Sequence, residues 1–234
     1  LRLFFEEELD GKSGKYRNHY RETLRGIIKH CVVRNWLPEK HGLETLLKNE
    51  KAISAAPQII TPAVYRLLLE SADAEVIPLV ALMGFCGVRF SEATRLTWED
   101  VWATDGYVVL NADQTKTAQR RLVPRFDALE AWLSPYSRHS GPVWVHTINS
   151  LNHVLKGLRK LVVISGIHNA LRHSYASYRL AVTRNANELA IEMGNSPQII
   201  YKNYRELVTP AQGKQWFSVM PEDIEQAKGL KNAS

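Results

Sequence analysis

The order of hydrophobic and polar positions predicts an amphipathic helix near the start of the chain. Over residues 14–36, apolar side chains recur at helical spacing, and basic side chains fill the positions between them. The pattern predicts a helix whose outer face is basic. Such a face is either ordinary solvated surface or a surface that follows the phosphates of a nucleic acid. Its basic residues are Lys15, Arg17, Arg21, Arg25 and Lys29.

Two further helical patterns follow a segment that mixes charge, proline and glycine. We place a domain boundary in that segment, near residues 50–60. Thr61 and Pro62 then have the residue types of an N-cap and a first helical position. The stretch from Ala74 to Cys86 is apolar nearly all round, which predicts a buried core helix.

The middle of the chain changes from helical to alternating spacing. Residues 107–110 and 122–123 are β-branched or apolar and flank a polar centre, which predicts a β-hairpin with Lys116 near its tip or on its first strand. From Asp127 onward the pattern is helical again, with Gly, Pro and Asn between the segments. The predicted fold class is therefore mainly α with one small antiparallel β-sheet, an α+β fold.

Composition narrows the classes of protein that fit these elements. The 234 residues are 45% hydrophobic, enough to bury a full core, and a formal charge of +6 with a pI near 9.3 suits a polyanionic partner without requiring one. Cys31 and Cys86 lie in apolar patterns without metal-binding spacing, so we interpret them as reduced thiols of an intracellular protein. The longest nearly uncharged run, residues 76–88, is too short to cross a bilayer, so we expect a soluble protein with no membrane partner.

Three stretches combine polar groups with an apolar scaffold: Arg89 after the apolar run, Arg172 in "HNALRHSYASY", and Tyr201 with Tyr204 in "MGNSPQIIYKNYREL". Each has an ordinary interpretation when taken alone. An arginine beside an apolar helix is usually a surface charge, and tyrosines three residues apart are usually a packing stripe.

In this order, however, the stretches resemble the tyrosine recombinase, or phage-type integrase, family over residues 60–208. The family's first arginine box is similar to "GVRFSEATRLTWEDV", and its lysine hairpin is similar to "QTKTAQRRLVP". Its second arginine box is similar to "NALRHSYAS", and the ending that carries its tyrosine is similar to "MGNSPQIIYKNY". The resemblance implies the fold of that family's catalytic domain.

The resemblance also implies catalytic roles. Arg89 and Arg172 would clamp the scissile phosphate, because guanidinium groups are planar, permanently charged, bidentate donors. Tyr204, nine residues after Asn195, would be the nucleophile in preference to Tyr201, and a 3′-phosphotyrosyl link would form. Lys116 would protonate the leaving 5′-oxygen. No metal, ATP or other cofactor is expected, since the covalent link conserves the phosphodiester.

The chain departs from the family pattern at two positions. Asn169 and Asn195 stand where the family commonly has histidines. Asparagine donates hydrogen bonds but does not shuttle protons, so we expect competence with a reduced or retuned rate. His168 could substitute sterically for one of them, or could be a surface residue at a helix start. We interpret Glu92 and His173 as structural residues that orient their neighbours.

The resemblance assigns parts of the chain and partners. Residues 1–55 would be the end of a helical core-binding domain, 56–208 the catalytic domain, and 209–234 a tail that docks on a neighbouring protomer or folds back on its own domain. The partner would be double-stranded DNA, bound by a homo-oligomer, a tetramer, in the cytoplasm at a prokaryotic or phage nucleoid. The residues of the first domain expected to bind DNA are Arg17, Arg21, Arg25 and Lys29.

Three other functions fit parts of the sequence. A topoisomerase-like nicking and closing enzyme would use the same residues. A DNA-binding protein with this fold and lapsed catalysis would explain the two asparagines. A helical protein without a DNA role would bind DNA weakly and independently of salt.

Overall fold

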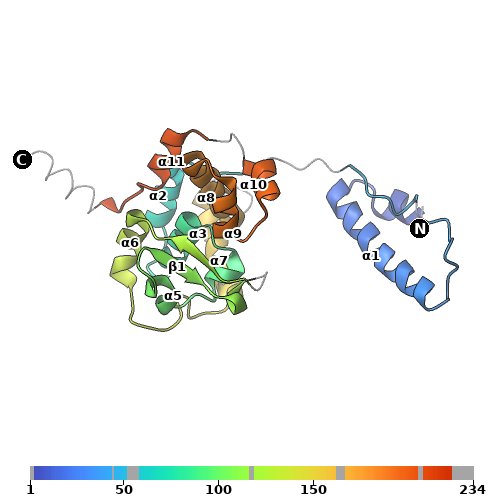
Figure 1. The fold of residues 1–234 in the computed structure, drawn as a ribbon, viewed down its shortest axis with the longest axis horizontal. Helices are drawn as coiled ribbons and strands as arrows, with labels where there is room; N and C mark the ends of the chain where they lie inside the picture. The colour runs from blue at the N-terminus through green and yellow to red at the C-terminus, as the bar shows by residue number, and fades with distance from the viewer. Residues whose placement is uncertain are drawn as a thin grey trace, which may run out of the picture. The chain divides into compact units, whose positions relative to one another are not determined.

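The computed structural model describes residues 3–43, 45–51, 58–115, 119–161, 167–204 and 208–222. It divides the chain into two compact units, Leu1–Ala56 and Pro57–Ser234 (Figure 1). The two units are described separately below, as unit 1 and unit 2.

Unit 1 is built on one long helix, α1 (Gly14–Val33), which follows a short π-helical segment, Phe4–Glu8. The Ser13 side chain caps α1 by accepting a hydrogen bond from the Tyr16 N–H at 3.2 Å. The predicted helix was three residues too long, because Asn35 has a left-handed backbone, with φ of 57°.

The basic residues of α1 do not all lie on its outer face. Arg21 is buried: it donates to Glu50 Oε1 at 2.6 Å, and its guanidinium lies over the Phe5 ring. The prediction that Arg21 belongs to the exposed basic face is therefore wrong, because its charge is used inside the unit. Arg17 also pairs with Glu50, at 2.7 Å, whereas Lys29 is exposed.

Unit 2 is mainly helical, with one two-stranded sheet, which confirms the predicted fold class. Its strands are β1 (Tyr107–Leu110) and β2 (Arg121–Pro124). Its helices, with short 3-10 segments between some of them, are α2 (Pro62–Glu70), α3 (Ile77–Cys86), α4 (Phe90–Ala93), α5 (Trp98–Trp102), α6 (Asp127–Leu133), α7 (Ile148–Leu158), α8 (Ile167–Thr183), α9 (Ala186–Met193), α10 (Pro197–Tyr204) and α11 (Pro210–Trp216).

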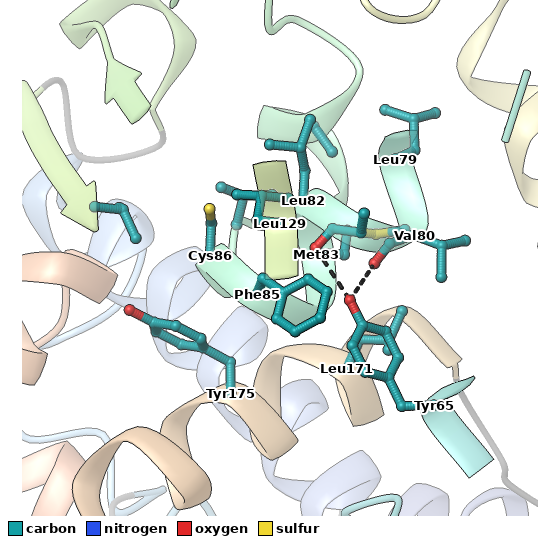
Figure 2. Close-up of a cluster of buried hydrophobic side chains, with 14 of the residues drawn as sticks. Tyr65, Leu79, Val80, Leu82, Met83, Phe85, Cys86, Leu129, Leu171 and Tyr175 are labelled. Atoms are coloured by element: carbon teal, nitrogen blue, oxygen red, sulfur yellow. Dashed lines mark hydrogen bonds between the residues drawn. The ribbon is translucent and has the colours of Figure 1, made fainter. Parts of the chain in front are cut away.

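Helix α3 is the centre of the core, as its apolar pattern predicts. Each of its residues is buried, and it packs against α8, α6 and α2. It begins at Ile77, three residues later than predicted, since Pro78 is tolerated only in the first turn of a helix. Tyr65 of α2 donates to the Val80 and Ala81 carbonyls of α3 (Figure 2). A rigid apolar helix therefore leads directly into Arg89.

Strands β1 and β2 are antiparallel, with Leu110 opposite Arg121, as the hairpin prediction requires. The direction of the β2 side chains is unexpected. Arg121 and Val123 are buried, whereas Leu122 is 41% exposed. The strand thus turns an arginine toward the interior of unit 2.

Helix α11 packs on its own unit, mainly against α8. The Trp216 ring is fully buried and stacks between Tyr65 and Tyr178, at centroid distances of 4.3 and 4.7 Å. Its indole N–H donates to the Gly84 carbonyl of α3 at 3.0 Å. The first half of the predicted tail is therefore part of unit 2, while residues 223–234 lie outside the described residues.

Candidate active site

Arg89 is fixed at the point where the core helix gives way to α4. The Glu92 carboxylate accepts from the Arg89 backbone N–H and from Arg89 Nη1, both at 2.8 Å. Arg89 is the N-cap residue of α4, so Glu92 both completes the capping box of this helix and orients the Arg89 guanidinium. The Arg89 side chain retains 22% exposure, which lets it reach an external ligand.

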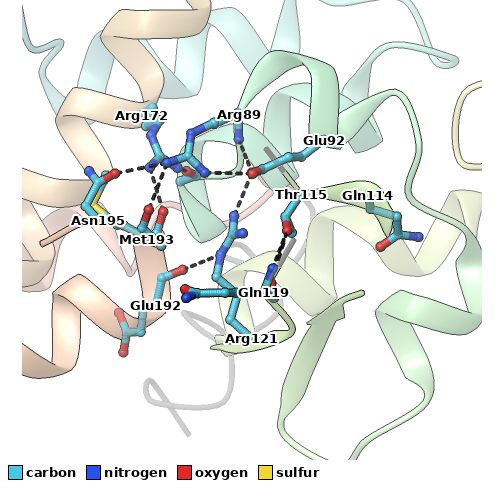
Figure 3. A network of polar contacts seen from close by, with 12 residues as sticks. Arg89, Glu92, Gln114, Thr115, Gln119, Arg121, Arg172, Glu192, Met193 and Asn195 are labelled. Atoms are coloured by element: carbon cyan, nitrogen blue, oxygen red, sulfur yellow. Dashed lines mark hydrogen bonds and ion pairs between the residues drawn. The ribbon is translucent and has the colours of Figure 1, made fainter. Parts of the chain in front are cut away.

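Glu92 holds a second arginine as well. The carboxylate is fully buried and pairs with Arg121 Nη2 at 2.6 Å (Figure 3). Burial by itself raises the Glu92 pKa, but the hydrogen bonds and charges of Arg121 and Arg89 outweigh it, so the pKa lies below its ordinary value. Glu92 is therefore ionised at neutral pH and is shared between two cations.

Arg121 is a site residue to which the sequence analysis gave no role. Its Nε–H donates to the Glu192 carbonyl at 2.9 Å, while its buried Nη1 has no hydrogen-bond partner among the described residues. An unpaired buried N–H group costs about 1–3 kcal/mol. Alternation along the strand was the available signal, since Arg121 shares a face with the apolar Val123.

Arg172 lies on α8 with nearly all of its side chain buried. It donates to the Gly87 carbonyl, directly after α3, and to the carbonyl of Met193, the last residue of α9, at 2.7 Å. Burial and the nearby charge of Arg89 lower the Arg172 pKa to about 10. Two of the five guanidinium N–H groups are used in these bonds, so others are left for an anion.

The turn between α9 and α10 brings a third segment to the arginines. Gly194 ends α9 with a left-handed φ of 60°, which a residue with a side chain rarely adopts. Arg89 Nη2 donates to the Gly194 carbonyl at 3.0 Å and to Asn195 Oδ1 at 2.9 Å. Asn195 therefore lies at the site, with its amide oxygen on Arg89 and its NH₂ group as a further donor.

Tyr204, at the end of α10, is 4% exposed, and its hydroxyl lies 2.7 Å from His173 Nδ1. Burial raises the Tyr204 pKa, against the opposing charges of Arg172 and Arg89. Burial and the charge of Arg172 lower the His173 pKa. His173 therefore contacts the candidate nucleophile directly. The other tyrosine of α10, Tyr201, is 54% exposed.

The structure does not bring every predicted site residue together. Asn169 is exposed on α8. Lys116 and the side chain of His168 lie outside the described residues. Within the ranges described, no group of three or more His, Cys, Asp or Glu residues could hold a metal ion. None of the described helices is both long and apolar enough to span a bilayer.

The arrangement is suited to binding an anion. Arg89, Arg121 and Arg172 converge from α4, β2 and α8, and Glu92 is the carboxylate that two of them share. The remaining positive charge and the spare guanidinium N–H groups match a phosphodiester. A tyrosine hydroxyl close enough for both Arg172 and Arg89 to lower its pKa completes the cluster.

Unit 2 has the fold of a tyrosine recombinase catalytic domain, as comparison with solved structures shows. The chain is similar to residues 75–356 of lambda integrase, solved as a dimer bound to a COC' core site, with 16% identity, a TM-score of 0.67 and coverage of 88% of this chain and 80% of that one. It is similar to XerA recombinase, with 15% identity, a TM-score of 0.57 and coverage of 92% and 86%.

A third similar structure is the integrase of the transposon Tn1549, solved with a circular intermediate DNA. It has 14% identity, a TM-score of 0.63 and coverage of 96% of this chain and 82% of that one. At these identities the similarity shows the fold alone. No protein-family model and no curated protein matches the sequence.

Proposed function

We propose that the protein breaks and rejoins double-stranded DNA in site-specific recombination, through a 3′-phosphotyrosyl intermediate formed by Tyr204. The observation that carries the proposal is the convergence of Arg89, Arg172 and Tyr204 from three separate helical segments. The recombinase fold and the DNA-bound state of two of the similar structures support it.

In this mechanism Arg89 and Arg172 bind the non-bridging oxygens of the scissile phosphate. Negative charge grows on these oxygens as the phosphorus is attacked, and fixed guanidinium groups stabilise it without reorganising. Asn195, held by Arg89, offers its NH₂ group to the same phosphate. The Tyr204 oxygen attacks, and the 5′-oxygen leaves.

The leaving oxygen takes a proton from a general acid, for which Lys116 on the hairpin is our candidate. The link to Tyr204 keeps the energy of the phosphodiester, so a 5′-hydroxyl can rejoin the strand without ATP. Exposed basic residues of α1, such as Lys29, would hold flanking DNA, and strand exchange would take place in a homo-oligomer on the DNA, at the nucleoid.

Covalent capture tests the proposal and does not require the target site to be chosen in advance. The protein is incubated with a pool of nicked duplexes of randomised sequence, and DNA that stays attached after denaturation is sequenced. Wild type is expected to yield adducts with an enriched sequence. Tyr204→Phe should yield none, whereas Tyr201→Phe, a matched tyrosine on the same helix, should behave as wild type.

Other outcomes point to other functions. Adducts lost with Tyr201→Phe and kept with Tyr204→Phe would contradict the assignment of the nucleophile. Specific, salt-sensitive binding without any adduct would mean a DNA-binding protein with lapsed catalysis. If the protein forms adducts and relaxes supercoiled DNA but never joins two duplexes, it is a nicking and closing enzyme.

A further inference from the structure

The hydroxyl of Tyr204 has a partner that the proposed function leaves unexplained. His173 Nδ1 lies 2.7 Å from the Tyr204 oxygen, within hydrogen-bond distance, and the two rings lie 5.5 Å apart between centroids. The histidine comes from α8 and the tyrosine from α10. The contact therefore joins the segment that carries Arg172 to the segment that carries the nucleophile.

His173 is in the protonation state that a base requires. Burial and the positive charge of Arg172 disfavour imidazolium, so the pKa of His173 lies below its ordinary 6.5. Among the described residues, the charges that act on the pair are those of Arg172, which lowers the pKa of both His173 and Tyr204, and Arg89, which lowers the pKa of Tyr204. A neutral imidazole with its proton on Nε2 presents Nδ1 as an acceptor.

The other described polar groups of the site cannot take the tyrosine proton. Asn195 is an amide, and the guanidinium groups of Arg89 and Arg172 are donors without an acceptor. Glu92 accepts from Arg89 and Arg121, and its lowered pKa makes it a weak base. Tyr204 is buried and its pKa is raised, so it needs a base to take its proton before it can attack.

We infer that His173 is the general base that deprotonates Tyr204, an inference that rests on the proposed DNA cleavage. As the Tyr204 O–H bond breaks, the proton moves to His173 Nδ1, and the oxygen electron pair forms the bond to phosphorus. The P–O5′ bond breaks, and its electron pair leaves on the 5′-oxygen, which is protonated by the general acid. On rejoining, the 5′-hydroxyl gives its proton back to the deprotonated general acid, and its oxygen forms the bond to phosphorus. The bond between phosphorus and Tyr204 breaks, and the phenolate takes the proton back from the His173 imidazolium.

The test compares the rate of adduct formation in His173→Gln with wild type, on a nicked duplex recovered by the capture experiment. Glutamine keeps a hydrogen-bond acceptor but cannot carry the proton away. We expect a rate loss of about 10²–10⁴-fold with unchanged DNA affinity and melting temperature. The matched control is His153→Gln, an exposed histidine on α7, which should retain the wild-type rate.

The pH profile separates a base from a positioning contact. At subsaturating DNA, the wild-type rate should fall as the pH drops through the lowered pKa of His173, below 6.5. That acid limb should disappear in His173→Gln. In His173→Ala, added imidazoles should restore part of the rate, with more rescue from the more basic ones.

A duplex with sulfur in place of the 5′-bridging oxygen separates the base from the acid. Thiolate leaves without a proton, so such a substrate should rescue Lys116→Ala but not His173→Gln. A wild-type rate and an intact acid limb in His173→Gln would overturn the inference and leave the proposed function standing. Failure of wild type to form any adduct would remove both.

Discussion

Two sets of arginines, one in each unit, differ in how their charge is balanced. In unit 1, Arg17 and Arg21 both pair with Glu50, and Arg21 also donates to the Leu46 carbonyl. The charges of these two arginines are therefore balanced by the Glu50 carboxylate within unit 1. In unit 2, three arginines surround the site and Glu92 serves two of them. The comparison separates arginines that hold a fold together from arginines that leave positive charge for a ligand.

The largest effect is expected from removing the Glu92 carboxylate that Arg89 and Arg121 share. Glu92→Gln leaves Arg89 and Arg121 without a buried counter-charge, and we expect a loss of about 3–5 kcal/mol in the free energy of unfolding of unit 2. The folded-state pKa of Glu92 is lowered, so its contribution is complete above the unfolded-state pKa and is lost as the pH falls through the folded-state value.

Chemical denaturation of both proteins between pH 7 and pH 3 measures that difference. The difference in the free energy of unfolding between wild type and Glu92→Gln should be largest at neutral pH and should disappear in acid. A constant difference over this range would show that Glu92 stabilises unit 2 by packing and not by charge.

The next largest effect should come from the geometry of the phosphate clamp. Arg172→Lys keeps a cation but loses the planar fork, and we expect adduct formation to slow by about 10²–10³-fold, as for the loss of one oxyanion-hole donor. Single-turnover kinetics on a captured duplex measure the rate. Arg179→Lys, on the same helix and paired with Glu192, is the control expected to retain cleavage.

A smaller effect should come from Arg121. In Arg121→Lys, the single side-chain nitrogen cannot donate to both Glu92 and the Glu192 carbonyl. Glu92 then holds Arg89 less firmly. We expect cleavage to be about 10-fold slower, which is a loss of about 1.4 kcal/mol of transition-state stabilisation. The control is Arg125→Lys, an arginine one residue past β2 whose side chain is 8% exposed and bonds Glu130. Equal losses in both variants would assign Arg121 a purely structural role.

The smallest effect should separate the exposed from the buried cations of α1. Lys29→Gln should reduce the slope of log affinity against log salt by about 0.9, the loss of one phosphate contact. Arg21→Gln should leave the slope unchanged and instead make unit 1 easier to unfold, seen as faster amide exchange along α1. A reduced slope in Arg21→Gln would mean that Arg21 reaches the phosphates from its buried position.

Much of the fold could be predicted because its signals are local. Thr61 and Pro62 start α2 by capping chemistry, the apolar stretch of α3 has to be buried, and the β1–β2 hairpin follows from alternation. The two arginines and the tyrosine of the candidate site were predicted from ordered motifs. These features depend on residues close together in sequence.

The features that were missed depend on residues far apart in sequence. The Arg21–Glu50 pair joins residues 29 positions apart, and the His173–Tyr204 contact joins residues 31 positions apart. Helical spacing gives no information about either partner. Arg121 was missed for another reason: its neighbour Leu122 is the more hydrophobic residue, yet the register of the sheet buries the arginine.

The bonds of Arg172 to two backbone carbonyls have a further consequence. Its guanidinium lies at the carboxyl ends of α3 and α9, where the partial negative charge of a helix dipole is concentrated. The residue therefore neutralises two helix dipoles, in addition to the phosphate binding that we propose for it. A protein with this fold and no DNA cleavage would still need the arginine at this position for folding. Conservation of this arginine among relatives would then report on folding as well as on catalysis.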